Sequence, residues 1–179
     1  MPLTLCMGSW AQAVIFPQKK QPGVAKITQK SNSYQLANKV LKASFINTGG
    51  KLYFNGCSEL GLQPYTELFK VLLGDGKTIT ASEMKLEDVK IVALTENPSA
   101  ATASLRYAGK ALEARFTYEE LSIVWRAVLR NGSHYLRTEM DIQAAKDLPM
   151  KGIVAINYLV AKNSAYTAPE VVGNTRGAI

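Results

Sequence analysis

Residues Lys110–Ala144 read KALEARFTYEELSIVWRAVLRNGSHYLRTEMDIQA, and this stretch decides the fold class. Apolar and polar residues alternate through three successive segments, with the period of two that is typical of half-buried β-strands. Glu119-Glu120 separates the first two segments, and Asn131-Gly132, a strong hairpin signal, separates the last two. The stretch therefore predicts a three-stranded antiparallel meander with two-residue turns.

These two turns predict a strand register. Trp125 is expected opposite Ala114 on one side and opposite Thr138 on the other. The same register brings apolar residues together in two further rows, which are Phe116, Ile123 and Met140, and Tyr118, Leu121 and Ile142. A slip of one residue would send every one of these side chains to the other face. We therefore expect Trp125 to be buried beneath the meander.

Polar side chains are expected on the opposite face of the meander. The register predicts three rows, namely Glu113, Arg126 and Arg137, then Arg115, Val124 and Glu139, then Thr117, Ser122 and Asp141. Arg126 directly opposite Arg137 would be repulsive unless acids intervene. Two interpretations stay open. The face is either a solvated charge lattice or a domain-docking face made by Glu113, Arg126, Arg137 and Glu139.

Further strands are indicated on both sides of the meander. The sequence predicts a hairpin of residues 40–46 and 51–55, strands at 66–73, 78–80 and 89–94, one helical turn within 82–88, and a strand covered on both faces at 153–160. Short strands at this spacing are typical of a sandwich. We predict an all-β, antiparallel β-sandwich domain over residues 34–179, incomplete at its C-terminus because the chain ends on the apolar Ile179.

The N-terminal residues resemble an export signal. Residues 1–13 are interpreted as a signal-peptide remnant, because Ala11-Gln12-Ala13 fits a signal-peptidase site that leaves Val14 first. A short buried strand is the alternative. The signal predicts a secreted, periplasmic or cell-surface protein. No stretch approaches the ~20 apolar residues of a membrane span.

The net charge of +7 comes from the start of the chain. Seven lysines and no acid precede Glu59, and the other 14 basic and 14 acidic residues cancel. The excess carries no arginine or aromatic motif, which argues against a nucleic-acid partner. Residues 14–33 are polar and contain Pro17, Pro22 and Gly23, so we expect a flexible basic linker there.

The sequence predicts no catalytic residue, metal ligand or cofactor. His134 is the only histidine, and Cys57 would be alone after removal of the leader, which excludes catalytic triads and His- or Cys-based metal sites. Glu139 and Asp141 share one strand face and cannot flank a sugar ring. Tyr65 and Tyr107 are candidates for glycan contact.

Three segments carry a family resemblance. They are Ser33–Phe45 with Gly49–Leu52, then Leu121–Asp141, and finally Val172–Gly177. Together they resemble the N-terminal β-sandwich domains of large secreted bacterial glycoside hydrolases of the α-galactosidase-like kind. The resemblance implies a galactose-mutarotase-like supersandwich that precedes a (β/α)₈ barrel, with the catalytic carboxylates in that barrel.

The resemblance therefore implies that the reaction is carried out by another domain and not by this chain. This chain would be a non-catalytic domain that packs against the catalytic domain of the same protein and acts in carbohydrate degradation. The alternative is a stand-alone carbohydrate-binding or adhesion module with a glycan as its partner.

Overall fold

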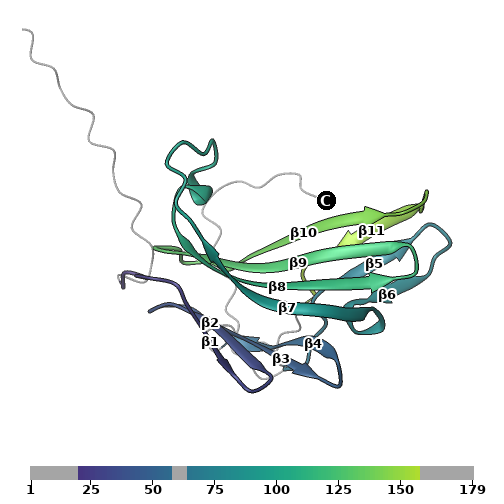
Figure 1. Cartoon of the computed structure of the whole chain (residues 1–179), viewed down its shortest axis with the longest axis horizontal. Helices are drawn as coiled ribbons and strands as arrows, with labels where there is room; N and C mark the ends of the chain where they lie inside the picture. The colour runs from purple at the N-terminus through teal and green to yellow at the C-terminus, as the bar shows by residue number, and fades with distance from the viewer. Residues whose placement is uncertain (1–19, 58–63, 158–179) are drawn as a thin grey trace, which may run out of the picture.

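The described part of the chain, residues 20–57 and 64–157 of a computed structural model, is built from antiparallel strands (Figure 1). The fold is the all-β sandwich that the sequence predicts. The strands are β1 (Lys26–Lys30), β2 (Ser33–Ala37), β3 (Lys42–Thr48), β4 (Lys51–Cys57), β5 (Lys70–Leu73), β6 (Thr78–Thr80), β7 (Lys85–Leu94), β8 (Gly109–Tyr118), β9 (Leu121–Arg130), β10 (Arg137–Ala144) and β11 (Met150–Val154). Two single-turn 3₁₀ helices, η1 (Ala81–Glu83) and η2 (Ala103–Leu105), complete the described elements.

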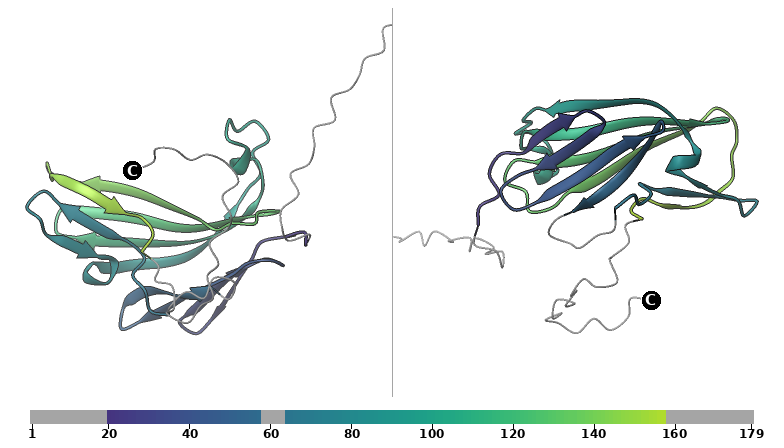
Figure 2. Two further views of the ribbon diagram at one scale, coloured as in Figure 1. Left: turned by 180° about the vertical axis from the view of Figure 1, so that it is seen from behind. Right: turned by 90° about the horizontal axis from the view of Figure 1, so that it is seen from below.

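Three sheets share these strands. The N-terminal sheet has the order β1-β2-β3-β4, the meander sheet β10-β9-β8-β7, and the small sheet β11-β5-β6. Figure 1 shows the N-terminal sheet on one side of the meander sheet, and the view from below in Figure 2 shows its strands crossing beneath that sheet. Four strands connected in chain order form each larger sheet, so local hairpins account for most of the pairing.

The core lies between the inner face of the meander sheet and the other two sheets. Trp125 of β9 is fully buried and meets Phe45 of β3 edge to face, with ring centroids 5.6 Å apart. Phe116 of β8 meets Phe69, which precedes β5, in the same geometry at 5.2 Å. Burial of such aromatic side chains supplies much of the hydrophobic stabilisation of a domain this small. The prediction that Trp125 is buried is confirmed.

The predicted register of the meander is confirmed for one hairpin and wrong for the other. Ala114 pairs with Trp125, as expected for a two-residue turn at Glu119-Glu120. On the other side, Met140 and not Thr138 pairs with Trp125. The shift is two residues, so each side chain keeps its predicted face, because strand side chains alternate with a period of two.

The physical reason lies in the β9–β10 connection. Asn131-Gly132 forms a turn in which the Ser133 N–H donates to the Arg130 carbonyl, but β10 does not follow it directly. Both residues also contact the N-terminal segment: Asn131 Oδ1 accepts a hydrogen bond from the Ala25 N–H, and the Gly132 N–H donates to the Gly23 carbonyl. The connection runs on to Arg137, where β10 begins. His134 lies in this connection.

The expected flexible linker over residues 14–33 is wrong for its second half. Residues Lys26–Lys30 form β1, and each of them pairs with a residue of β2. Ile27 packs against the core, and the hydrogen bonds of Ala25 with Asn131 and of Gly23 with Gly132 anchor the chain just before the strand. The pattern of β1 contains a single apolar residue, so its pairing depends on contacts that are distant in sequence.

The remaining differences concern strand ends. The predicted strand at residues 66–73 is confined to β5, although Thr66 forms an isolated bridge with Phe54. The helical turn expected within residues 82–88 is η1, and β7 starts earlier than predicted. In β11, Ile153 is 44% exposed, so this strand is not covered on both faces. Residues 1–13 and the matched segment Val172–Gly177 lie outside the described residues. Within the described ranges, no helix has the length and apolar character needed to cross a membrane.

Candidate domain-docking face

The outer face of the meander sheet, turned away from Trp125 and the N-terminal sheet, carries the charged residues that the sequence singles out. Alternation places Glu113 of β8, Arg126 of β9, and Arg137 and Glu139 of β10 on this side. We call these four residues, with Lys90 of β7 and Asp141 of β10, the ionic face. Figure 2 shows that the N-terminal sheet leaves this side of the meander sheet open.

Glu113 is at the centre of the ionic face and is only 9% exposed. Its carboxylate accepts a hydrogen bond from Arg126 Nε at 2.6 Å and forms an ion pair with Lys90 Nζ at 2.9 Å. Burial by itself raises the pKa of Glu113, but the hydrogen bonds from Lys90 and Arg126 outweigh it, and the net pKa is lowered. Glu113 is therefore a carboxylate at neutral pH.

Arg126 links two acids. Its Nε group bonds Glu113, and its second donor nitrogen bonds Asp141 at 2.7 Å. The hydrogen bond to Asp141 raises the pKa of Arg126 and outweighs the opposing effect of burial. A guanidinium that bridges two carboxylates is held in one orientation by its planar fork of donors.

The expected repulsion between Arg126 and Arg137 does not occur. The two-residue shift of β10 places Glu139 opposite Arg126, and Val128 opposite Arg137. Arg137 forms an ion pair with Glu139 on its own strand. The three cations of the ionic face are thus matched by three carboxylates, in a chain of Lys90, Glu113, Arg126 and Asp141 and in the separate pair of Arg137 and Glu139.

The segment of residues 95–108, which joins β7 to β8, closes one end of the ionic face. Arg130 donates to the Tyr107 carbonyl at 2.6 Å, and Arg137 donates to Ser104 Oγ at 2.9 Å. Ala111 and Val128 point to the outer face, yet they are 0% and 2% exposed and are not part of the core. The segment rises from the side of the meander sheet that faces away from the N-terminal sheet (Figure 1). It therefore forms a wall beside the ionic face.

The two candidate glycan contacts do not share a surface. Tyr65 and Tyr107 are both 58% exposed, as a glycan contact requires. Tyr107 belongs to the wall of the ionic face. Tyr65 packs edge to face against Tyr53, with centroids 6.3 Å apart, and Tyr53 points out of the N-terminal sheet because its neighbours Leu52 and Phe54 are buried. The two tyrosines cannot form one aromatic platform.

Sequence reasoning missed Lys90 and Asp141 as members of the ionic face. Lys90 enters through the pairing of β7 with β8, where it lies opposite Glu113. The sequence contains this signal, since Lys90 alternates with Val89 and Ile91, but the strand pairing was needed to locate its partner. Asp141 was placed on the correct face and in the wrong row.

The carboxylates of the ionic face are held in ion pairs, and the pKa of Glu113 is lowered. A general acid at neutral pH needs a raised pKa instead. Among the described residues, no group of three histidine, cysteine or acidic side chains is placed to hold a metal ion.

Comparison with protein-family models, curated proteins and solved structures finds no match to this chain.

Proposed function

We propose that this chain is a non-catalytic β-sandwich domain of a secreted glycoside hydrolase, found in the periplasm or at the cell surface, and that its ionic face packs against the catalytic domain of the same protein. The resemblance of its strands to the N-terminal domains of such enzymes supports the carbohydrate link, and the sandwich fold is compatible with it. The observation that carries the docking proposal is Glu113, a nearly buried carboxylate in the middle of the outer face of the meander sheet.

Glu113 makes the ionic face suitable for a second domain. Burial of an unpaired charge in an interface costs several kcal/mol, but a charge that already has its partners loses less. Lys90 and Arg126 provide those partners before any docking occurs. Their side chains are also already ordered, which reduces the entropy lost on association. The wall of residues 95–108 adds a rim that would fix the position of the docked domain.

The proposal assigns the reaction to the partner domain. Retaining and inverting glycosidases need two carboxyl groups on either side of the scissile bond, one of them protonated. The chain contributes a preformed polar surface instead.

The test is a substitution that blocks the face without disturbing the fold. Val124 lies on the outer face of β9, between Arg115 and Asp141 in the register. Val124→Arg adds a long side chain there, and we expect the unfolding free energy of the 179-residue chain to change by no more than about 0.5 kcal/mol, as for other surface substitutions. In the protein encoded by the complete reading frame, the same change should lower both thermal stability and glycosidase activity.

The matched control is Thr28→Arg, which adds the same side chain to an exposed position of β1 on the N-terminal sheet. It should leave both proteins unchanged. Equal effects of Val124→Arg in the two proteins would contradict docking. A reading frame that stops shortly after Ile179, without the roughly 250 residues that a barrel requires, would contradict the multidomain proposal as a whole.

A further inference from the structure

The outer face of the N-terminal sheet has a charge pattern unlike that of the rest of the molecule. Leu36, Phe45 and Phe54 point into the core, so the residues that alternate with them point away from it. Lys26 and Lys30 of β1, Lys42 of β3 and Lys51 of β4 lie on this outward side, and Lys39 lies in the connection between β2 and β3. We call these five residues the lysine face.

Four of the five lysines of the lysine face have no ion pair among the described residues. The first acidic residue of the chain is Glu59, so the N-terminal sheet contains no carboxylate side chain. Lys51 interacts electrostatically with Glu83, but within residues 20–57 and 64–157 no ion pair involves Lys26, Lys30, Lys39 or Lys42. Lys85 and Lys90 of β7 and Lys146, just after β10, differ, because each of them pairs with a glutamate.

The strand register spaces these charges regularly. Lys26 pairs with Ala37, and Ala37 pairs with Lys42, so the two lysines are two strands apart on either side of a small side chain. Two strand spacings correspond to about 10 Å. Lys26 and Lys30 are four residues apart on one strand, or about 13 Å. An ordered sheet therefore presents a flat array of separated ammonium groups.

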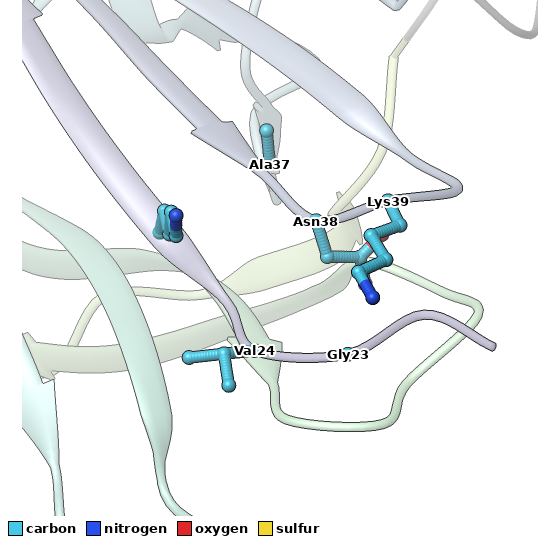
Figure 3. A pocket seen from close by; sticks show the side chains of 6 residues that line it. Gly23, Val24, Ala37, Asn38 and Lys39 are labelled. Carbon is cyan, nitrogen blue, oxygen red and sulfur yellow. The ribbon is translucent and has the colours of Figure 1, made fainter.

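A recess lies at one end of the lysine face (Figure 3). It has a volume of about 410 Å³ and is lined by Gly23, Val24, Lys26, Ala37, Asn38 and Lys39. The Asn38 side chain accepts hydrogen bonds from the Val40 and Leu41 N–H groups and donates to the Ser133 carbonyl. These bonds hold the lining of the recess in place. Figure 3 shows the side chain of Lys39 beside Gly23. Two lysines, Lys26 and Lys39, thus border this recess.

An aromatic pair lies on the same outward side of the sheet. Tyr53 of β4 points out of the sheet and packs against Tyr65, whose ring is more than half exposed. Tyrosine rings combine an apolar surface with a hydroxyl group, and neighbouring strands supply further hydroxyl and amide groups through Thr28, Gln35 and Ser44. A surface with separated ammonium groups, polar side chains and one aromatic pair fits a chain that is both anionic and rich in hydroxyl groups.

We propose that the lysine face binds an acidic polysaccharide, one that carries carboxylate or sulfate groups. Duplex DNA fits less well, because the face is flat, has no element that could enter a groove, and contains no arginine for bidentate contacts with phosphates. A lipid bilayer also fits less well, because amphipathic membrane binding needs a large apolar surface beside the basic one. The inference goes beyond the proposed function, since it needs neither a catalytic partner nor the ionic face.

The experiment measures binding of the 179-residue chain by isothermal titration at 0.15 M salt. The probes are dextran sulfate and alginate, which present sulfate and carboxylate groups respectively, with unsulfated dextran and a DNA duplex as comparisons. We expect binding to at least one of the two acidic polymers and none to dextran. The double substitution Lys26→Gln/Lys42→Gln should weaken that binding about tenfold, because it removes two of the five ammonium groups of the lysine face.

The control is Lys85→Gln/Lys146→Gln, which removes the same net charge from the meander sheet and should leave the affinity within about twofold. Tyr65→Ala should weaken polysaccharide binding and leave the far-UV circular dichroism spectrum unchanged. The proposal is overturned if neither acidic polymer binds, or if both double variants weaken binding equally. Binding of DNA as tight as that of the polysaccharide would also overturn it, with non-specific attraction of polyanions as the explanation. None of these results bears on the docking of a catalytic domain, which is tested through Val124.

Discussion

Replacement of Trp125 tests the sandwich most directly, because this side chain joins the two larger sheets. The indole is fully buried in the middle of β9, between Ala114 and Met140, and meets Phe45 of the N-terminal sheet edge to face. Emptying a large aromatic site costs about 3–5 kcal/mol. The edge-to-face contact accounts for about 0.5–1.5 kcal/mol of it.

One feature of Trp125 reduces the cost of its removal. The indole Nε1–H is buried and has no acceptor among the described residues. An unsatisfied buried donor costs a folded protein about 1–3 kcal/mol, and that cost disappears with the indole. We therefore expect Trp125→Ala to lower the unfolding free energy by about 3 kcal/mol. Trp125→Phe keeps a ring against Phe45 and loses the unpaired donor, so it should cost about 1 kcal/mol or less.

The assay is urea unfolding of the 179-residue chain, followed by far-UV circular dichroism. The midpoint should fall with an unchanged slope, since a changed slope would signal a different denatured state. A loss near 3 kcal/mol is a large part of the 5–15 kcal/mol that stabilises an ordinary domain. If Trp125→Phe proves as destabilising as Trp125→Ala, the indole nitrogen has a partner and the reasoning fails. A cost below about 1 kcal/mol for Trp125→Ala would refute its position in the core.

Three further predictions follow from single contacts. In Gly109→Ala, a Cβ would overlap the Leu129 carbonyl and lie 2.9 Å from the backbone of Arg130. We therefore expect urea unfolding to show a loss of more than about 2 kcal/mol in the unfolding free energy. In Gly132→Ala, the Cβ would lie in open space but at a φ of +75°, so the loss should be only about 1–2 kcal/mol. Arg126→Ala leaves Glu113 with Lys90 alone and should cost about 1–3 kcal/mol, whereas exposed Arg115→Ala should stay within about 0.5 kcal/mol by the same assay. Because the pKa of Glu113 is lowered in the folded state, its stabilisation is present above the unfolded value of about 4.3 and is lost as the pH falls through the folded pKa. Unfolding measured from pH 3 to 7 should show a constant difference between wild type and Glu113→Gln near neutrality that shrinks below about pH 4; a difference independent of pH would contradict the ion pairs.

Much of the meander could be predicted from residues 110–144 alone. Alternation with a period of two assigned Trp125 to the core, and it assigned Glu113, Arg126, Arg137 and Glu139 to the other face. This information is local, because each residue needs only its neighbours in the strand to define a face. It also survived the error in register, since a shift of two residues leaves every side chain on the same side.

The partners on the ionic face could not be predicted in the same way. The length of the β9–β10 connection decides whether Arg126 lies opposite Arg137 or Glu139, and Asn131 and Gly132 of this connection are hydrogen-bonded to Ala25 and Gly23. Those contacts join positions more than a hundred residues apart. No property of the dipeptide Asn-Gly by itself indicates that it will be used to hold a distant segment.

For the lysines too, the sequence determined one part of the result and the tertiary structure another. Composition established that the basic excess precedes Glu59, and the polar, proline-containing sequence around it favoured a linker. The tertiary structure decided that Lys26, Lys30 and Lys42 lie on an ordered sheet, because Ile27 packs against the core and β1 pairs with β2. Alternation is a property of a strand, whereas pairing, turn length and the position of a charge in space are properties of the contacts that the strand makes with the rest of the fold.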